Sequence, residues 1–232
     1  MSAEDVFSPS RFVEDGLLIS GGKSCGKSTL ARNLAASMPR EWNIRVFDTT
    51  QVWNRSSIPY RWICKDSSQL PRFETGDVVY DMSRLKVLEM RLLVDDLLAR
   101  EFAIHVREGG ALTVFVFEEG HLYFNPYQFR KNSAAETLRL VTTGRNFGFS
   151  YMVITQRNQL LDTSIWEICG QWFIGRIPRP LPYFSPILGK RYAEGLKMLN
   201  KGEFLYVEDG KIMFTKSRVF AEETSKRVMN DG

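Results

Sequence analysis

The sequence has few of the residues from which disulfide-stabilised and zinc-binding proteins are built. Its 232 residues include three cysteines and two histidines. Cys25, Cys64 and Cys169 form no CxxC pair, and His105 and His121 have no spacing typical of a metal site. A disulfide framework and a structural zinc site are therefore excluded as the basis of the fold. We expect the three thiols to be reduced.

Long apolar runs and blocks of like charge are absent as well. The longest apolar runs are far shorter than the roughly 20 residues of a membrane-spanning helix. Residues 1–5 are acidic, whereas the start of a signal peptide is basic. We therefore expect a cytoplasmic protein. The net charge of +4 permits contact with nucleic acid, but any basic surface must come from folding.

One motif is present in full. Residues 21–28, Gly-Gly-Lys-Ser-Cys-Gly-Lys-Ser, match the pattern GxxxxGK[ST] at every fixed position. An apolar run, 17–19, precedes the motif, and a helical segment, 29–36, follows it. Strand, loop and helix in this order are the context that a phosphate loop requires, and they disfavour an ordinary glycine-rich turn.

The chemistry of the motif explains its spacing. Glycines at both ends carry no Cβ, so the loop can turn its backbone N–H groups toward a triphosphate. We expect Lys27 to reach the β- and γ-phosphates of a nucleoside triphosphate, and the Ser28 hydroxyl to bind Mg²⁺ beside the positive end of the helix dipole. Cys25 lies near the same helix N-terminus, where a thiol is expected to be partly exposed and reactive. The predicted nucleotide-binding residues are Gly21, Gly22, Lys23, Ser24, Cys25, Gly26, Lys27, Ser28 and Thr29.

Apolar runs alternate with amphipathic segments along the chain. This alternation predicts an α/β fold with a mostly parallel central sheet flanked by helices. The run 112–117 is the most hydrophobic and is typical of a central strand covered on both faces. Two late runs joined by Glu-Asp-Gly predict a C-terminal β-hairpin. Strands are expected at about 16–20, 43–48, 77–81, 112–117, 150–155, 171–176, 203–207 and 211–215, and helices at about 27–38, 83–106, 133–143, 165–168 and 187–199.

Four segments have weaker patterns. Residues 49–76 favour neither strand nor loop, and the proline-rich segment 178–186 is expected to be a loop. Residues 1–12 are predicted to be a flexible extension, and residues 219–232 a loose tail. The predicted organisation is one domain, 13–218, between two flexible ends.

Two acidic residues follow the most apolar strand. Glu118 and Glu119 come directly after the run 112–117, and the C-terminal ends of parallel strands lie beside the phosphate loop. We expect Glu118 to hold Mg²⁺, directly or through water, and Glu119 to accept the proton of an attacking water. In a chain without a phosphate loop, two solvated acids at a strand end would be the default interpretation.

A glutamine and an arginine complete the predicted catalytic set. Gln156 follows the strand 150–155, where its amide could hydrogen-bond the γ-phosphate or orient the water. Arg145 precedes that strand, on the far side of the sheet from its own nucleotide, where it could serve a neighbouring subunit. Taken alone, Arg145 is typical of a surface cation and Gln156 of a capping amide. The order of the motifs favours the catalytic interpretation, with Lys27, Glu119, Gln156 and Arg145 as catalytic residues.

The order of these motifs resembles the HerA/FtsK superfamily of P-loop motor ATPases, which have a RecA-like (ASCE) fold. The resemblance runs from about residue 17 to residue 214 and includes GGKSCGKS, FVFEEGH and GRNFGFSYMVITQR. The late LNKGEFLYVEDGKIMF resembles the C-terminal Gly-Glu hairpin of the family. Glu118 stands where the family usually has aspartate, and its extra methylene favours coordination of Mg²⁺ through water. The small size most resembles the genome-packaging ATPases of tailless icosahedral viruses.

This resemblance implies an ATP-hydrolysing translocase of double-stranded DNA that works as a ring, commonly a hexamer, with ATP between subunits. Arg145 would be the arginine finger that one subunit inserts beside the nucleotide of the next. Capsid or virion membrane proteins would be further partners, in the host cytoplasm or in the virion. Candidate contacts to DNA in the pore are Tyr123, Phe124, Tyr127, Phe129, Arg130 and Lys131, with packing in the core or at a subunit interface as the alternative.

Two other functions are compatible with a phosphate loop. A P-loop kinase of a nucleotide or small molecule would be monomeric and would close an arginine-rich lid over its substrate, but no arginine-dense segment is present. A nucleotide-switched assembly module would use ATP to close a ring, and turnover would be incidental. Stimulation of hydrolysis by DNA distinguishes a translocase from both.

Overall fold

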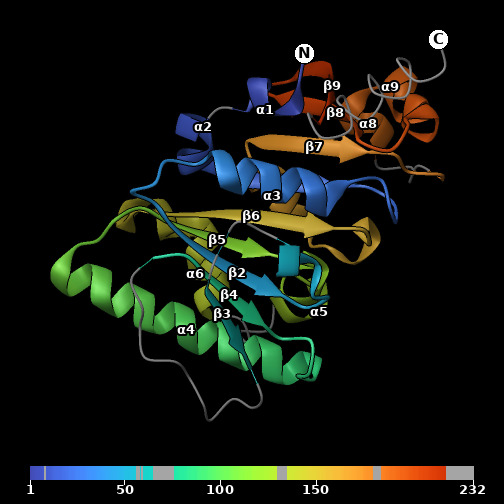
Figure 1. Cartoon of the computed structure of the whole chain (residues 1–232). Helices are drawn as coiled ribbons and strands as arrows, with labels where there is room; N and C mark the ends of the chain where they lie inside the picture. Colours follow the sequence, from blue (N-terminus) through green and yellow to red (C-terminus); the bar gives the residue numbers. More distant parts are fainter. Residues whose placement is uncertain are drawn as a thin grey trace.

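One sheet of nine strands runs through the part of the chain that the structure describes (Figure 1). The computed structural model describes residues 1–7, 9–55, 58, 60–64, 76–129, 135–179 and 184–217. The strands are β1 Leu17–Ser20, β2 Asn43–Asp48, β3 Tyr60–Ile63, β4 Val78–Asp81, β5 Thr113–Phe117, β6 Phe149–Thr155, β7 Gln171–Gly175, β8 Glu203–Glu208 and β9 Lys211–Lys216. The helices are α1 Ala3–Val6, α2 Pro9–Asp15, α3 Lys27–Ser37, α4 Val87–Glu108, α5 Pro126–Phe129, α6 Ala135–Thr143, α7 Thr163–Ile168, α8 Phe184–Leu188 and α9 Lys190–Gly195.

The strand order is β3-β4-β2-β5-β6-β1-β7-β8-β9. Strands β3 to β7 in this order are all parallel, and β8 and β9 are added antiparallel as a hairpin at β7. β1 lies between β6 and β7, with Leu17 opposite Met152 and Gln171. Because parallel strands end at the same edge, the loops after β1, β2, β5 and β6 meet there. The predicted α/β class, with a mostly parallel sheet and a C-terminal hairpin, is confirmed.

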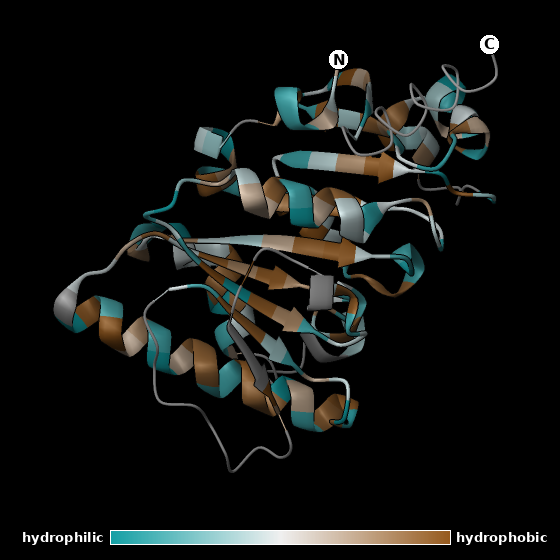
Figure 2. Cartoon of the chain, viewed as in Figure 1, coloured by the Kyte–Doolittle hydropathy of each residue, from teal (hydrophilic) through white to brown (hydrophobic). Residues whose placement is uncertain are grey.

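Helices cover both faces of the sheet, which explains why the strands are apolar along most of their length (Figure 2). Side chains of α1, α2 and α3 pack against one set of strand residues, among them Ile19 and Val116. Side chains of α4, α6, α7, α8 and α9 pack against the other set, among them Leu18 and Phe117. Every residue of β5 is buried, as predicted for a central strand.

Most of the expected elements are present. β2 has the predicted bounds, and α3 ends at Ser37, just before the proline that stops it. α4 begins at Val87 instead of residue 83, because a turn comes first. α6 ends at Thr143 as expected, but the first residues of its predicted capping box, 133–134, lie outside the described residues. The predicted tail, 219–232, also lies outside them.

The prediction of a flexible N-terminal extension is wrong for the described residues of that segment. They form α1 and the start of α2, and both Ala3 and Phe12 are fully buried. Glu4 accepts hydrogen bonds from Asn33 of α3 at 3.0 Å and from Ser217, just after β9, at 3.1 Å. The segment therefore joins the phosphate-loop helix to the C-terminal hairpin.

The region predicted as a loop and one helix, 178–199, is divided differently. α8 contains Pro186 in its first turn, where the missing N–H is not needed, so the predicted loop is wrong at residues 184–186. Gly189 then adopts a φ of 80° and separates α8 from α9, which replaces the single expected helix. In the unassigned stretch 49–76, the structure shows a short 3₁₀ helix, η1 (Val52–Arg55), and the edge strand β3.

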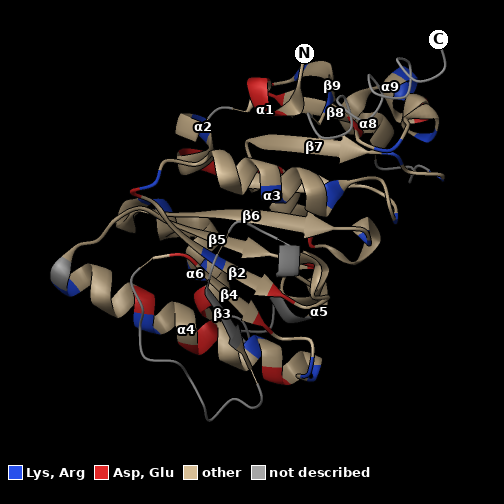
Figure 3. Ribbon diagram, viewed as in Figure 1, with Lys and Arg blue, Asp and Glu red and all other residues tan. Residues whose placement is uncertain are grey.

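Charged residues mark the edge of the sheet at which the strands end (Figure 3). Asp48 ends β2 and Asp81 ends β4, and both side chains are buried. Burial raises the pKa of the Asp48 carboxyl, although backbone N–H groups of η1 and of the preceding turn counteract this effect. None of the helices in the described ranges is both long enough and apolar enough to cross a bilayer.

Candidate active site

The predicted phosphate loop connects β1 to α3 and has the backbone that its glycines were expected to permit. Gly21 has a φ of 152°, and Gly26, at the N-terminus of α3, has a φ of 107°. A Cβ on Gly21 would lie 2.7 Å from the Cys25 sulfur and 3.2 Å from the backbone of Gly175 in β7. The loop is packed so closely against β7 that only glycine fits at its first position.

Polar groups of the protein itself hold the loop. The Lys27 ammonium donates a hydrogen bond to the Gly22 carbonyl at 2.8 Å, and its side chain is largely buried. The Gly22 N–H donates to the Arg176 carbonyl at 2.7 Å, and the Cys25 carbonyl accepts a bond from Gly202 at 2.8 Å. The ammonium of Lys27 therefore lies inside the loop, next to the space where phosphates would bind.

The expectation that Cys25 is partly exposed and reactive is wrong. Its side chain is 3% exposed, and its sulfur is enclosed by Gly21 and Gly175. Burial raises the pKa of the Cys25 thiol, and the nearby Lys27 lowers it by less. The thiol packs as a small apolar side chain beneath the loop.

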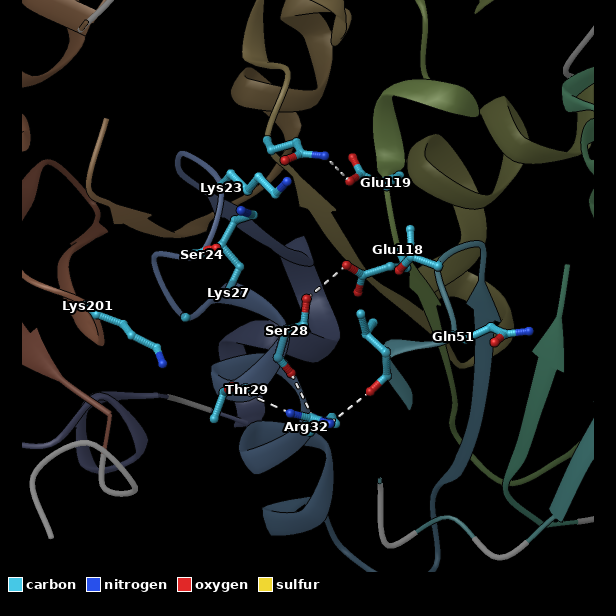
Figure 4. A pocket seen from close by; sticks show the side chains of 14 residues that line it. Lys23, Ser24, Lys27, Ser28, Thr29, Arg32, Gln51, Glu118, Glu119 and Lys201 are labelled. Carbon is cyan, nitrogen blue, oxygen red and sulfur yellow. Dashed lines mark hydrogen bonds between the residues drawn. The ribbon is translucent and has the colours of Figure 1, made fainter. Parts of the chain in front are cut away.

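A cleft of about 680 Å³ opens above the loop. In Figure 4, Lys23, Lys27 and Ser28 lie on one side of the cleft, and Glu118 and Glu119 lie opposite them. The cleft thus has cations and hydroxyls on the loop side and carboxylates on the side of β5. The lining residues are Lys23, Ser24, Gly26, Lys27, Ser28, Thr29, Arg32, Thr50, Gln51, Val52, Glu118, Glu119, Gln156 and Lys201.

Glu118 is held by two donors from different elements. The Ser28 hydroxyl donates to Oε1 at 2.9 Å, and the Trp53 indole N–H donates to Oε2 at 3.2 Å. Burial raises the pKa of the Glu118 carboxyl to about 7, while these two hydrogen bonds act in the opposite direction.

The oxygens of Ser28 and Glu118 form a donor set that suits a hard cation such as Mg²⁺. Among the described residues, no group of three or more His, Cys, Asp or Glu side chains could hold a metal ion. Mg²⁺ keeps several waters and is bound through one or two protein groups together with substrate phosphates. The predicted pair Ser28 and Glu118 therefore fits Mg²⁺.

Glu119 has a backbone conformation that is rare for residues other than glycine. Its φ of 55° and ψ of 50° place it in the left-handed region, where strained residues cluster at functional sites. Its Oε1 accepts a hydrogen bond from Gln156 Nε2, and its Oε2 lies 3.3 Å from Nδ1 of His121. A Cβ on the next residue, Gly120, would lie 2.3 Å from Val153 in β6. The close contact between these strand ends brings Glu119 and Gln156 together.

Arg145 lies at the opposite edge of the sheet from this cleft. It belongs to the 3₁₀ helix η3 (Gly144–Phe147), which leads into the N-terminal end of β6, whereas Gln156 follows the C-terminal end. Its side chain is exposed, and its guanidinium has no hydrogen bond or ion pair with the residues that the structure describes. The structure therefore does not bring Arg145 to the cleft of its own chain.

The aromatic residues predicted to line a pore differ in their exposure to solvent. Tyr123 and Phe124 are 1% and 0% exposed and pack against Phe117, so the alternative of core packing is correct for them. Tyr127 is 79% exposed, which leaves it available for contact. The side chain of Phe129 and residues 130–131 lie outside the described part of the chain.

Several residues of the site have no signal in the sequence pattern. Trp53 and Val52 belong to the stretch that the pattern left unassigned, and Arg32 is a half-buried residue of the predicted helix after the phosphate loop. Lys201 reaches the cleft from the turn before β8. Asp48 could have been found, because it ends an apolar strand just as Glu118 does.

Comparison with solved structures shows the same fold in proteins of low sequence identity. The genome packaging NTPase B204 from Sulfolobus turreted icosahedral virus 2, in complex with AMPPCP, aligns over 88% of this chain and 98% of its own, with a TM-score of 0.61 and 18% identity. VirB4 of Thermoanaerobacter pseudethanolicus aligns over 87% and 89%, with a TM-score of 0.67 and 11% identity. The cytoplasmic domain of the Thermomonospora curvata Type VII secretion ATPase EccC aligns over 87% of this chain but 25% of its own, with a TM-score of 0.57 and 14% identity.

No protein-family model matches the sequence, and no curated protein matches it. The structural similarity nevertheless extends over nearly nine tenths of the chain. It confirms, for the fold, the resemblance drawn from the order of the motifs. The chain has the fold of the genome packaging NTPase B204 and of VirB4.

Proposed function

We propose that the protein is a Mg²⁺-dependent ATPase that translocates DNA, as a subunit of a viral genome-packaging motor. The observation that carries this proposal is the pairing of Glu119 with Gln156 across the cleft from the phosphate loop. A carboxylate beside an amide at the γ-phosphate end of the cleft suits the activation of water. B204, which shares the fold, is described as a DNA-packaging ATPase.

Each residue of the cleft has its own role in the proposed hydrolysis. The loop N–H groups and Lys27 bind the triphosphate and stabilise charge on its β- and γ-oxygens. Ser28 and Glu118 would hold Mg²⁺, which when bound neutralises phosphate charge. Glu119 accepts the proton of the attacking water, and Gln156 orients that water or bonds the γ-phosphate.

In this proposal Arg145 supplies the arginine that acts on the transferred phosphoryl group, because Arg32, which lines the cleft, already donates to the carbonyls of Ser28 and Val52. Developing charge on the transferred phosphoryl group is commonly stabilised by an arginine, with an effect of about 10³ to 10⁵ in rate. Arg145 is exposed at the opposite edge of the sheet, where it can only reach the cleft of another copy. A ring, by analogy a hexamer, would place each Arg145 beside the nucleotide of the next subunit. Double-stranded DNA would then occupy the pore, and a capsid or virion membrane protein would dock the ring.

The test is the ATPase rate as a function of protein concentration, with and without double-stranded DNA. We expect the specific rate to rise with concentration and with DNA. Lys27→Ala should abolish nucleotide binding, and Glu119→Gln should bind ATP without hydrolysing it. A rate that is independent of concentration and appears only with a small acceptor molecule would instead show a monomeric kinase. Assembly with ATP that survives in Glu119→Gln, with no effect of DNA, would show an assembly module.

The role of Arg145 is tested by mixing variants. Arg145→Ala should bind ATP normally and lose turnover, as Glu119→Gln does. Mixed rings should regain part of the activity, because some interfaces then pair an intact Glu119 with an intact Arg145. Arg84→Ala, which removes another exposed arginine, is the control and should keep full activity. Loss of ATP affinity in monomeric Arg145→Ala would contradict a role in the neighbouring site.

A further inference from the structure

Trp53 is a large buried side chain in direct contact with the candidate metal site. It lies in η1, just after β2, and its side chain is 2% exposed. Its indole N–H donates a hydrogen bond to Glu118 Oε2 at 3.2 Å. An indole nitrogen can only donate a hydrogen bond, so Oε2 of Glu118 must be the acceptor, with a lone pair directed at Trp53.

The backbone that carries Trp53 is fixed from two sides. Asp48 accepts hydrogen bonds from the N–H of Trp53 at 3.0 Å and from that of Thr50 at 3.1 Å. Arg32 of α3 donates to the carbonyl of Val52 at 2.8 Å. The same guanidinium also donates to the carbonyl of Ser28 at 3.2 Å. The position of the indole is thereby tied to the helix that carries Ser28.

The two carboxylate oxygens of Glu118 have separate partners. Ser28 holds Oε1 at 2.9 Å, and Trp53 holds Oε2 at 3.2 Å, so rotation of the carboxylate would break both bonds. A glutamate side chain has one more rotatable bond than an aspartate side chain. Rotation about that bond must be restrained if the carboxylate is to bind a cation in a single geometry. The donor on Oε2 supplies this restraint from outside the phosphate loop.

We propose that Trp53 is a positioning residue that orients the Glu118 carboxylate toward Ser28, so that a divalent cation entering with the nucleotide meets a preformed oxygen pair. The proposal rests on the proposed function of this cleft as a Mg²⁺·ATP site. It adds a residue of η1 to the machinery and gives the glutamate at position 118 a partner suited to its length. Removing the indole N–H should weaken Mg²⁺ binding without weakening metal-free nucleotide binding.

The first experiment compares Trp53→Phe with Trp172→Phe. Each variant keeps an aromatic ring and loses one indole donor, and Trp172 donates to the Cys169 carbonyl. The affinity of the protein for a non-hydrolysable ATP analogue is measured by calorimetry in EDTA and during a Mg²⁺ titration. We expect Trp53→Phe to raise the apparent Kd for Mg²⁺ about tenfold and to leave binding in EDTA unchanged. Trp172→Phe should change neither. A Kd for Mg²⁺ within twofold of wild type in folded Trp53→Phe would overturn the proposal.

The second experiment separates orientation from a packing effect. Glu118→Asp shortens the side chain, so that the carboxylate no longer reaches the indole. In this background, Trp53→Phe should have little further effect on the Kd for Mg²⁺. An equal loss in both backgrounds would show that Trp53 acts by packing, and would also overturn the proposal. If the wild-type protein binds Mg²⁺·nucleotide but never hydrolyses ATP, the proposed function fails, yet the Trp53 comparison still decides this inference.

Discussion

Replacing Glu118 with glutamine should stabilise the metal-free protein at neutral and alkaline pH. Burial raises the pKa of Glu118 from 4.5 to about 7, so ionising this carboxyl in the folded protein costs more than in the unfolded chain. The stability that the wild-type protein draws from the protonated form is complete below about pH 4.5. It is lost as the pH rises toward 7, because the unfolded chain releases its proton first.

The size of the effect follows from this pKa. At about 1.4 kcal/mol per pH unit, a rise from 4.5 to about 7 corresponds to a loss of about 3 kcal/mol in the free energy of unfolding. Glutamine carries no charge, and its amide can accept from Trp53 and donate to the Ser28 hydroxyl. The free energy of unfolding of Glu118→Gln should therefore exceed that of wild type by an amount that grows by about 3 kcal/mol between pH 4.5 and pH 8.

The assay is urea denaturation of nucleotide-free protein in EDTA at a series of pH values. Glu167→Gln, which neutralises an exposed acid, is the control and should run parallel to wild type throughout. Parallel curves for Glu118→Gln and wild type would refute the reasoning, because they would show that Glu118 ionises as easily in the cleft as in the unfolded chain. Such stabilisation at the expense of activity is typical of catalytic sites.

Three other predictions concern the packing of the N-terminal helices, of the strand ends and of the phosphate loop. Phe12→Ala should lower the free energy of unfolding by about 3 to 5 kcal/mol, measured in urea, since the ring is fully buried; a change below about 1 kcal/mol would mean that the N-terminal helices are not docked. Gly120→Ala should lower turnover about 100-fold in an ATPase assay, because the new methyl group would meet Val153 at 2.3 Å and displace the preceding glutamate. Gly195→Ala, where nothing lies within 4 Å, should leave the rate unchanged. Cys25 should react with a thiol reagent only after denaturation, and rapid labelling that nucleotide blocks would contradict its buried position.

Elements with a strong local signal were predictable from the sequence. The run 112–117 contains only apolar residues and one threonine, so it can only be stable when it is buried on both faces. In the structure, every residue of β5 is buried. The bend of the phosphate loop follows from glycines that no other residue could replace. By contrast, residues 1–12 look polar, and their docking depends on Ala3 and Phe12 entering a core formed by distant strands. The break at Gly189 was missed because a glycine within a helical pattern does not show whether the helix continues.

The sequence by itself determined that a phosphate loop is present, and that Glu118, Glu119 and Gln156 each follow a buried strand. These are local properties, set by residue type and by the alternation of apolar segments. Only the tertiary structure decided which of these groups meet. The strand order places β5 and β6 side by side, so that Glu119 and Gln156 are in contact, while Arg145 is left at the far edge. It also brought Trp53 to the carboxylate of Glu118. The two residues are 65 positions apart in the sequence, and they meet because β2 and β5 are parallel neighbours in the sheet.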